Sequence, residues 1–93
     1  MSVEPSPHKN KKWRANFYDK ANDKRKHTDF GASGYTDFLL SGNIDLKNKY
    51  QKRHSKDLET NDPTRAGYLS MFLLWNKPTM HESISDYKRR FNM

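Results

Sequence analysis

Residues 67–75, with the sequence Gly-Tyr-Leu-Ser-Met-Phe-Leu-Leu-Trp, decide the fold of this chain. Seven of these nine side chains are large and apolar, in a protein that is only 32% hydrophobic. Asp62 and Pro63 precede the stretch as a favourable helix N-cap and first helical residue. Pro78 follows it and forces the preceding residue out of the helical region. The sequence therefore predicts a buried helix over residues 63–75.

A β-hairpin is predicted over residues 12–31. Aromatic and polar residues alternate from Trp13 to Tyr18, which is the period of a half-buried strand. Residues 19–25 have the composition of a turn, and Thr28 and Phe30 share one face of the returning strand. Two strands alone are marginally stable in water, so helices must cover the aromatic face of this hairpin.

Two further helices are predicted from their N-caps. Asn43 can cap a surface helix over residues 44–55, followed by a polar loop over residues 56–62. Thr79 and Glu82 form a capping box that starts a helix over about 80–91. The apolar residues of this last helix recur on one face: Met80, Ile84, Tyr87 and Phe91. Residues 35–40 fit either a third short strand or a helical turn.

These elements predict a small α+β protein, in which an N-terminal β-hairpin packs against two or three short α-helices. The single domain spans residues 11–93, and residues 1–10 form a flexible, extended arm with no part in the core, since Pro5 and Pro7 prevent helix. The side chains predicted to form the core are Tyr68, Leu69, Phe72, Leu73, Trp75, Ile84 and Tyr87.

The composition limits the classes of function. Leu, Ile, Val and Phe account for only 15 of the 93 residues, so the core is thin and partners are expected to contribute to stability. There is no cysteine, which excludes disulfides and thiolate zinc sites. No apolar run approaches the roughly 18–20 residues of a transmembrane segment. The net charge of +7 predicts an acidic macromolecular partner.

No pattern of residues indicates catalysis. The four histidines are scattered without the spacing of metal ligands, and Ser70 has no acid–base pair near it in sequence. The carboxylates fall mostly in turns and caps, which is their ordinary structural use. We therefore expect a protein that is not an enzyme, with no cofactor, no metal and no small-molecule substrate.

The basic residues form separate groups that could contact nucleic acid or another acidic partner. They lie before the hairpin, at its tip, on the middle helix and at the end of the last helix: Lys9, Lys11, Lys12, Arg14; Lys24, Arg25, Lys26; Lys47, Lys49, Lys52, Arg53, Lys56; Lys88, Arg89, Arg90. Charge of this kind favours phosphate contact without base readout. Stacking on single strands would need Trp13, Phe17 or Tyr18, although the core competes for these rings.

Several strings of the sequence are shared with a known family: residues 30–38, 49–54, 64–68, 73–79 and 83–84, of which Leu73-Leu74-Trp75-Asn76-Lys77-Pro78 is the most specific. Through them, residues 11–91 of the chain resemble a family of small, basic, uncharacterised proteins encoded by large DNA viruses of algae and amoebae. Residues 39–46 depart from the family, which is usually more charged there, and the hairpin tip lacks a glycine. The family has no assigned activity, so the resemblance transfers no site to this chain. What the resemblance implies is a viral origin.

The resulting expectation is a small structural component of a large DNA virus particle, either a minor capsid or an internal virion protein. It would bridge larger viral structural proteins, and it would be found in the virion and, during assembly, in the host cytoplasm or nucleus. The alternative is a nucleic-acid-binding protein that contacts or condenses the viral genome.

Overall fold

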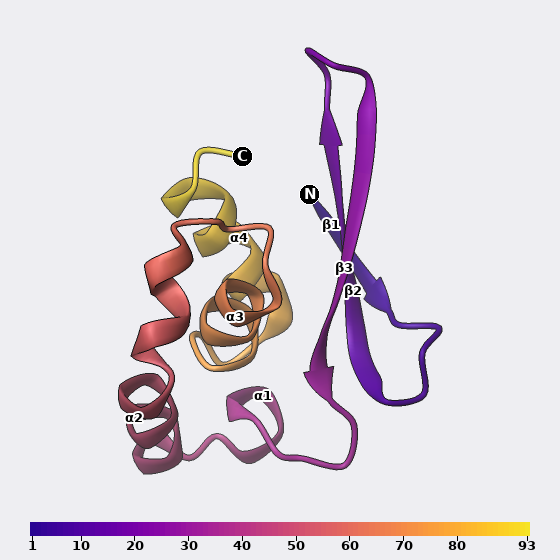
Figure 1. Ribbon diagram of the computed structural model, residues 1–93. Coiled ribbons are helices and arrows are strands. Elements are labelled where there is room, and N and C mark those ends of the chain that lie inside the picture. Colours follow the sequence, from indigo (N-terminus) through magenta and orange to yellow (C-terminus); the bar gives the residue numbers. More distant parts are fainter.

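A computed structural model describes residues 1–93 as a three-stranded antiparallel sheet followed by short helices (Figure 1). This is the α+β class that the sequence predicted. In chain order, the elements are β1 (Ser2–Pro5), β2 (Lys11–Asp19), β3 (Lys24–Ala32), α1 (Phe38–Ser41), α2 (Ile44–Arg53), the 3₁₀ helix η1 (Ser55–Thr60), α3 (Ala66–Leu69), the π-helix η2 (Ser70–Leu74) and α4 (Met80–Arg90). No helix combines the length and the hydrophobicity that crossing a bilayer requires.

Strands β2 and β3 form the predicted hairpin. Trp13 pairs with Phe30 and Ala15 pairs with Thr28, so these four side chains share one face of the sheet. Ala15 and Phe30 are completely buried there. Asp23 stands at the tip with a left-handed backbone, a conformation that Asp tolerates better than most residues.

Strand β1 corrects the prediction that residues 1–10 take no part in the core. Ser2–Pro5 pairs with β2 in antiparallel fashion, with Val3 opposite Ala15. Met1 and Val3 also pack against the core. Pro5 is tolerated because β1 lies at the edge of the sheet, where a missing backbone donor breaks no ladder.

The central helix, which consists of α3 and η2, is shorter than predicted. Its second half is a π-helix, which is wider than an α-helix. The central helix begins at Ala66, with Arg65 as its N-cap, because the Asp62 carboxylate accepts hydrogen bonds from the backbone and hydroxyl of Thr64 and holds a turn there. The backbone continues as a π-helix over Ser70–Leu74. The prediction of a helix from residue 63 with an Asp62 cap is therefore wrong, whereas the burial of the stretch is confirmed.

The segment between the sheet and the central helix is more helical than predicted. Residues 38–41 form one helical turn, which Asp37 caps by accepting from the Leu40 amide and Gly42 ends in a left-handed conformation. Asn43 caps α2 as predicted, through the Leu46 amide. Residues 55–60 form the 3₁₀ helix η1, so the prediction of a polar loop over 56–62 is wrong for most of its length.

Helix α4 begins at the predicted cap. The Thr79 hydroxyl accepts from the Glu82 amide, but the Glu82 carboxylate accepts from the Thr79 hydroxyl and not from the Thr79 amide. The four-residue apolar pattern of the helix faces the core as its spacing predicted. At its centre Tyr87 is fully buried and donates a hydrogen bond to the Pro63 carbonyl.

The helices cover one face of the sheet, and the core lies between that face and the helices (Figure 1). The buried core residues come from both halves of the chain: Ala15, Phe30, Phe38, Tyr68, Leu69, Leu73, Leu74, Trp75 and Tyr87. Of the seven side chains predicted for the core, five are in this set. The other two, Phe72 and Ile84, are partly buried against it.

Asp86 is a nearly buried carboxylate that ties the corner after Trp75 to helix α4. It accepts hydrogen bonds from Asn76 at 2.7 Å, Arg89 at 3.0 Å and Arg90 at 3.2 Å. The bond from Asn76, followed by those from the two arginines, lowers the pKa of Asp86 to about 2. The two arginines predicted at the end of α4 as partner contacts are therefore also used within the fold.

The protein is expected to lose stability between about pH 4 and pH 2. The folded-state pKa of Asp86 lies below the ordinary value of 3.8, so its contribution is complete above that value and disappears as the pH falls to about 2. Asp29, whose pKa is lowered to about 2 chiefly by Arg14, acts in the same direction. Urea unfolding followed by circular dichroism at a series of pH values measures this loss.

The variant Asp86→Asn isolates one part of this acid sensitivity. It should be less stable than the parent protein at neutral pH, and the difference should shrink toward pH 2, where the parent's Asp86 is itself protonated. Glu59→Gln, at an exposed position on η1, is the matched control. A constant difference between Asp86→Asn and the parent across the acid range would contradict the assignment.

Candidate functional site

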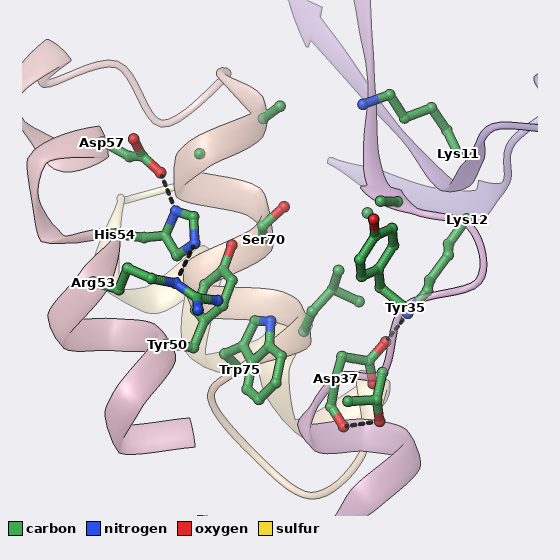
Figure 2. Close-up of a pocket in the computed structure, with 16 residues that line it drawn as sticks. Lys11, Lys12, Tyr35, Asp37, Tyr50, Arg53, His54, Asp57, Ser70 and Trp75 are labelled. Carbon is green, nitrogen blue, oxygen red and sulfur yellow. Dashed lines mark hydrogen bonds and ion pairs between the residues drawn. The ribbon is translucent and has the colours of Figure 1, made fainter. Parts of the chain in front are cut away.

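A cleft of about 450 Å³ opens between the sheet and the helices (Figure 2). One wall consists of the start of β2, the end of β3 and the loop before α1. The other wall consists of the end of α2, the central helix and Trp75. The volume falls in the range of roughly 300–1,000 Å³ that is typical of small-molecule sites.

Three stacked rings form the base of the helical wall. The rings of Trp75 and Tyr50 are nearly parallel, with centroids 4.5 Å apart and planes at 9°, and His54 stacks on Tyr50 at 4.2 Å. The Gln51 side chain holds the end of this stack by donating to the Trp75 carbonyl at 2.8 Å. Tyr50 lies in the last turn of α2 and His54 is the C-cap of that helix, and their spacing of four residues places them on one helix face.

Hydroxyl groups are directed into the cleft from the same wall. Tyr50 and Ser70 both belong to it, and their hydroxyls lie on the same side of the cleft in Figure 2. Burial raises the pKa of Tyr50, so its hydroxyl stays protonated and can donate. Ser70, which has no acid–base pair near it in sequence, lines the cleft.

His54 joins a short polar chain at the rim. Its Nδ1 lies 3.1 Å from the Asp57 carboxylate, and its Nε2 accepts from Arg53 Nε at 3.3 Å. A His–Asp pair of this kind could orient a general base, but Nε2, the nitrogen that would deprotonate a nucleophile, is occupied by Arg53. The chain therefore fixes the position of the Arg53 guanidinium and does not reproduce a nucleophile-activating triad.

The sheet wall carries one paired and one unpaired lysine. Lys12 donates to the Asp37 carboxylate at 2.6 Å, and both side chains are mostly buried. Lys11 has no carboxylate partner, and its amino group points across the cleft in Figure 2. Tyr35 stands beside them with 74% of its surface exposed and packs on no other ring.

The structure brings together only some of the predicted contact residues. Lys11, Lys12 and Arg53, from two separate basic groups, line this one cleft. Arg14 is bound to Asp29 at 2.8 and 3.1 Å, and Arg89 and Arg90 are bound to Asp86. The other predicted basic residues lie outside the cleft: Lys9, Lys24, Arg25, Lys26, Lys47, Lys49, Lys52, Lys56 and Lys88.

A second hollow of about 560 Å³ lies on the hairpin. Phe17, Tyr18, Arg25 and His27 are among its lining residues. The guanidinium of Arg25 lies 5.6 Å from the centre of the Tyr18 ring, and the Tyr18 hydroxyl donates to Asp23 at 2.7 Å. Of the three aromatic rings considered for stacking, Tyr18 is exposed, whereas Trp13 and Phe17 are partly buried against the core.

Sequence reasoning found the cations of the cleft but not the cleft itself. Its walls meet only through tertiary packing, and the four-residue spacing of Tyr50 and His54 was the one local signal of the stacked rings. The His54–Asp57 spacing of three residues was a second signal of a helical pair. No three His, Cys, Asp or Glu side chains gather in a metal-binding group.

A family model described as a family of unknown function, DUF5754, matches residues 1–54 of the chain. The matched part comprises the whole sheet, α1 and α2, including Lys11, Tyr35 and Arg53 of the cleft. Comparison with curated proteins and with solved structures finds no match.

Proposed function

Since the chain belongs to the DUF5754 family of unknown function, its role must be argued from its surface, and we propose that it is a small structural protein of a large DNA virus particle. In this role it is not an enzyme, and it bridges larger neighbours as a minor capsid or internal virion protein. The viral setting follows from the resemblance of residues 11–91 to small basic proteins of such viruses. The bridging role follows from the surface described next.

The observation that carries the proposal is the difference between the two ends of the molecule. Its extents are 41 × 27 × 23 Å, and the hairpin tip and the α1–α2 corner lie at opposite ends of the view in Figure 1. One end carries unpaired cations beside an exposed ring, and the other carries exposed apolar side chains. A protein built in this way can hold two different neighbours at once.

The apolar end is the turn over residues 41–43, which joins α1 to α2. Leu40 and Ile44 flank this turn and are 72% and 63% exposed. Both residues lie outside the buried core and the side chains packed on it. Large exposed apolar side chains that stand together are typical of protein-binding surfaces, so we assign this end to a protein neighbour.

The cationic end is the tip of the hairpin, which extends beyond the helices in Figure 1. Lys24 and Arg25 begin β3 there, and Tyr18 is 50% exposed opposite Arg25. No carboxylate forms an ion pair with Lys24 or Arg25. Unpaired cations of this kind attract acidic surfaces and steer association.

The proposal predicts that the double variant Leu40→Asp, Ile44→Asp is lost from virus particles. Charges at both positions would have to be desolvated in an apolar interface, which is unfavourable. The fold should survive, because both side chains are largely exposed. Mass spectrometry of purified particles measures incorporation, and cross-links from nearby Lys47 and Lys49 should identify the neighbouring protein.

The matched control is Met93→Asp, which places the same charge on an exposed apolar residue far from the corner in sequence. It adds one of the two charges that the double variant adds, and it should leave incorporation unchanged. Normal incorporation of the double variant, or absence of the protein from purified particles, would refute the bridging proposal.

The alternative is a nucleic-acid-binding protein that contacts or condenses the viral genome. The Tyr18–Arg25 stack on the exposed hairpin favours it, because an aromatic ring beside unpaired cations suits single strands. A steep loss of DNA affinity with increasing salt would support this alternative over the leading proposal. Absence of measurable DNA binding at low salt would remove it.

A further inference from the structure

We propose that the cleft between the sheet and the helices binds a single nucleotide, with its phosphate held by Lys11 and Arg53 and its base stacked on Tyr35. The nucleotide is either free or one unit of a single strand. The basic groups in the sequence indicated phosphate contact, but they did not indicate a site for a single nucleotide. The site is separate from the hairpin tip and the α1–α2 corner, so it goes beyond the bridging role.

The charge of the cleft favours a phosphate. Its carboxylates already have partners, since Asp37 binds Lys12 and Asp57 binds His54. Lys11 and Arg53 remain without carboxylate partners, and they project from opposite walls. An unpaired cation on each side of a concave site attracts an anion more strongly than a cation on an open surface.

Arg53 is also held in a fixed position. Its Nε donates to His54 Nε2, which in turn is placed by Asp57 and by stacking on Tyr50. The two terminal nitrogens of the guanidinium have no partner within the protein and remain available. A guanidinium with two free parallel donors is suited to bind two oxygens of one phosphate.

Tyr35 accounts for the planar part of the ligand. It is the one aromatic residue of the cleft that neither joins the core nor packs on another ring. An exposed ring beside a cation is the usual platform for a nucleic-acid base. The hydroxyls of Tyr50 and Ser70 lie on the opposite wall, where they can form hydrogen bonds with the edge of the base (Figure 2).

Isothermal titration calorimetry of the full chain tests this inference. The probes are the adenosine, guanosine, cytidine and uridine monophosphates, adenosine alone, inorganic phosphate, and a single-stranded oligoadenylate. At least one monophosphate, or the oligoadenylate, should bind more tightly than both adenosine and phosphate. Arg53→Gln should weaken this binding about tenfold, as expected for the loss of a charged hydrogen bond. Tyr35→Ala should weaken it without changing the weak binding of phosphate.

The control is Lys52→Gln, the neighbouring cation on α2, which is exposed and does not line the cleft. Binding of the strand but not of free monophosphates, lost in Arg53→Gln and Tyr35→Ala, would assign the site to a nucleotide within a strand. Equal weakening by Lys52→Gln and Arg53→Gln would mean binding to general surface charge and would overturn the inference. So would the absence of any monophosphate or oligoadenylate that binds more tightly than both adenosine and phosphate.

Discussion

Replacing Trp75 with Ala is expected to lower the free energy of unfolding by about 3–5 kcal/mol, the usual cost of removing a large buried aromatic side chain. Trp75 is only 8% exposed, stacks on Tyr50 and ends the central helix. The whole stability of a domain of this size is about 5–10 kcal/mol. The variant should therefore be partly or wholly unfolded at moderate temperature.

Thermal unfolding followed by far-ultraviolet circular dichroism measures this loss. Trp75→Phe is the informative companion, because it keeps a ring to stack on Tyr50 and should lose much less stability. A melting temperature of Trp75→Ala close to that of the parent protein would contradict the burial of Trp75. It would also make the end of the helix a docking surface instead of part of the core.

Replacing Gly31 with Ala is expected to have the second largest effect. Gly31 has a φ of +79°, and a left-handed backbone costs a residue with a side chain about 1–2 kcal/mol. The added Cβ would also lie 2.9 Å from Leu74 Cδ1. Leu74 is buried and cannot simply move away, so overpacking adds about 1–3 kcal/mol.

Gly34→Ala separates these two causes. Gly34 has a similar φ of +86°, but no atom lies within 4 Å of the Cβ that would be added. It should therefore show only the backbone cost of about 1–2 kcal/mol. Urea unfolding of both variants gives the difference. Equal losses would mean that Leu74 yields freely and that the sheet and the central helix pack loosely at this point.

The elements that the sequence predicted well are those with a local cause. The hairpin follows from alternation between Trp13 and Tyr18, and helices α2 and α4 follow from the caps Asn43 and Thr79, which the structure places as predicted. In each case the decisive groups lie within a few residues of one another. Such interactions can be recognised without knowing which distant segments meet.

The elements that were missed depend on distant partners. Strand β1 contains Pro5 and few apolar residues, and it forms because β2 offers a free edge. Asp62 bonds to Thr64 instead of capping the helix, and the Pro63 carbonyl between them accepts from the buried Tyr87 hydroxyl of α4. The cleft likewise requires Lys11 and Arg53, 42 positions apart, to line its opposite walls. Charge and spacing alone could not show either arrangement.

The division of the core between the two halves of the chain has a consequence for synthesis. Phe30 and Ala15 share their buried cluster with Leu69, Leu73 and Tyr87, so their apolar cover is incomplete until these three residues have been made. The part that matches the family model, residues 1–54, contains the sheet but none of these covering side chains. At usual elongation rates a nascent chain would expose part of its aromatic face to solvent for roughly 3–10 seconds, long enough for a chaperone or an assembly partner to bind first.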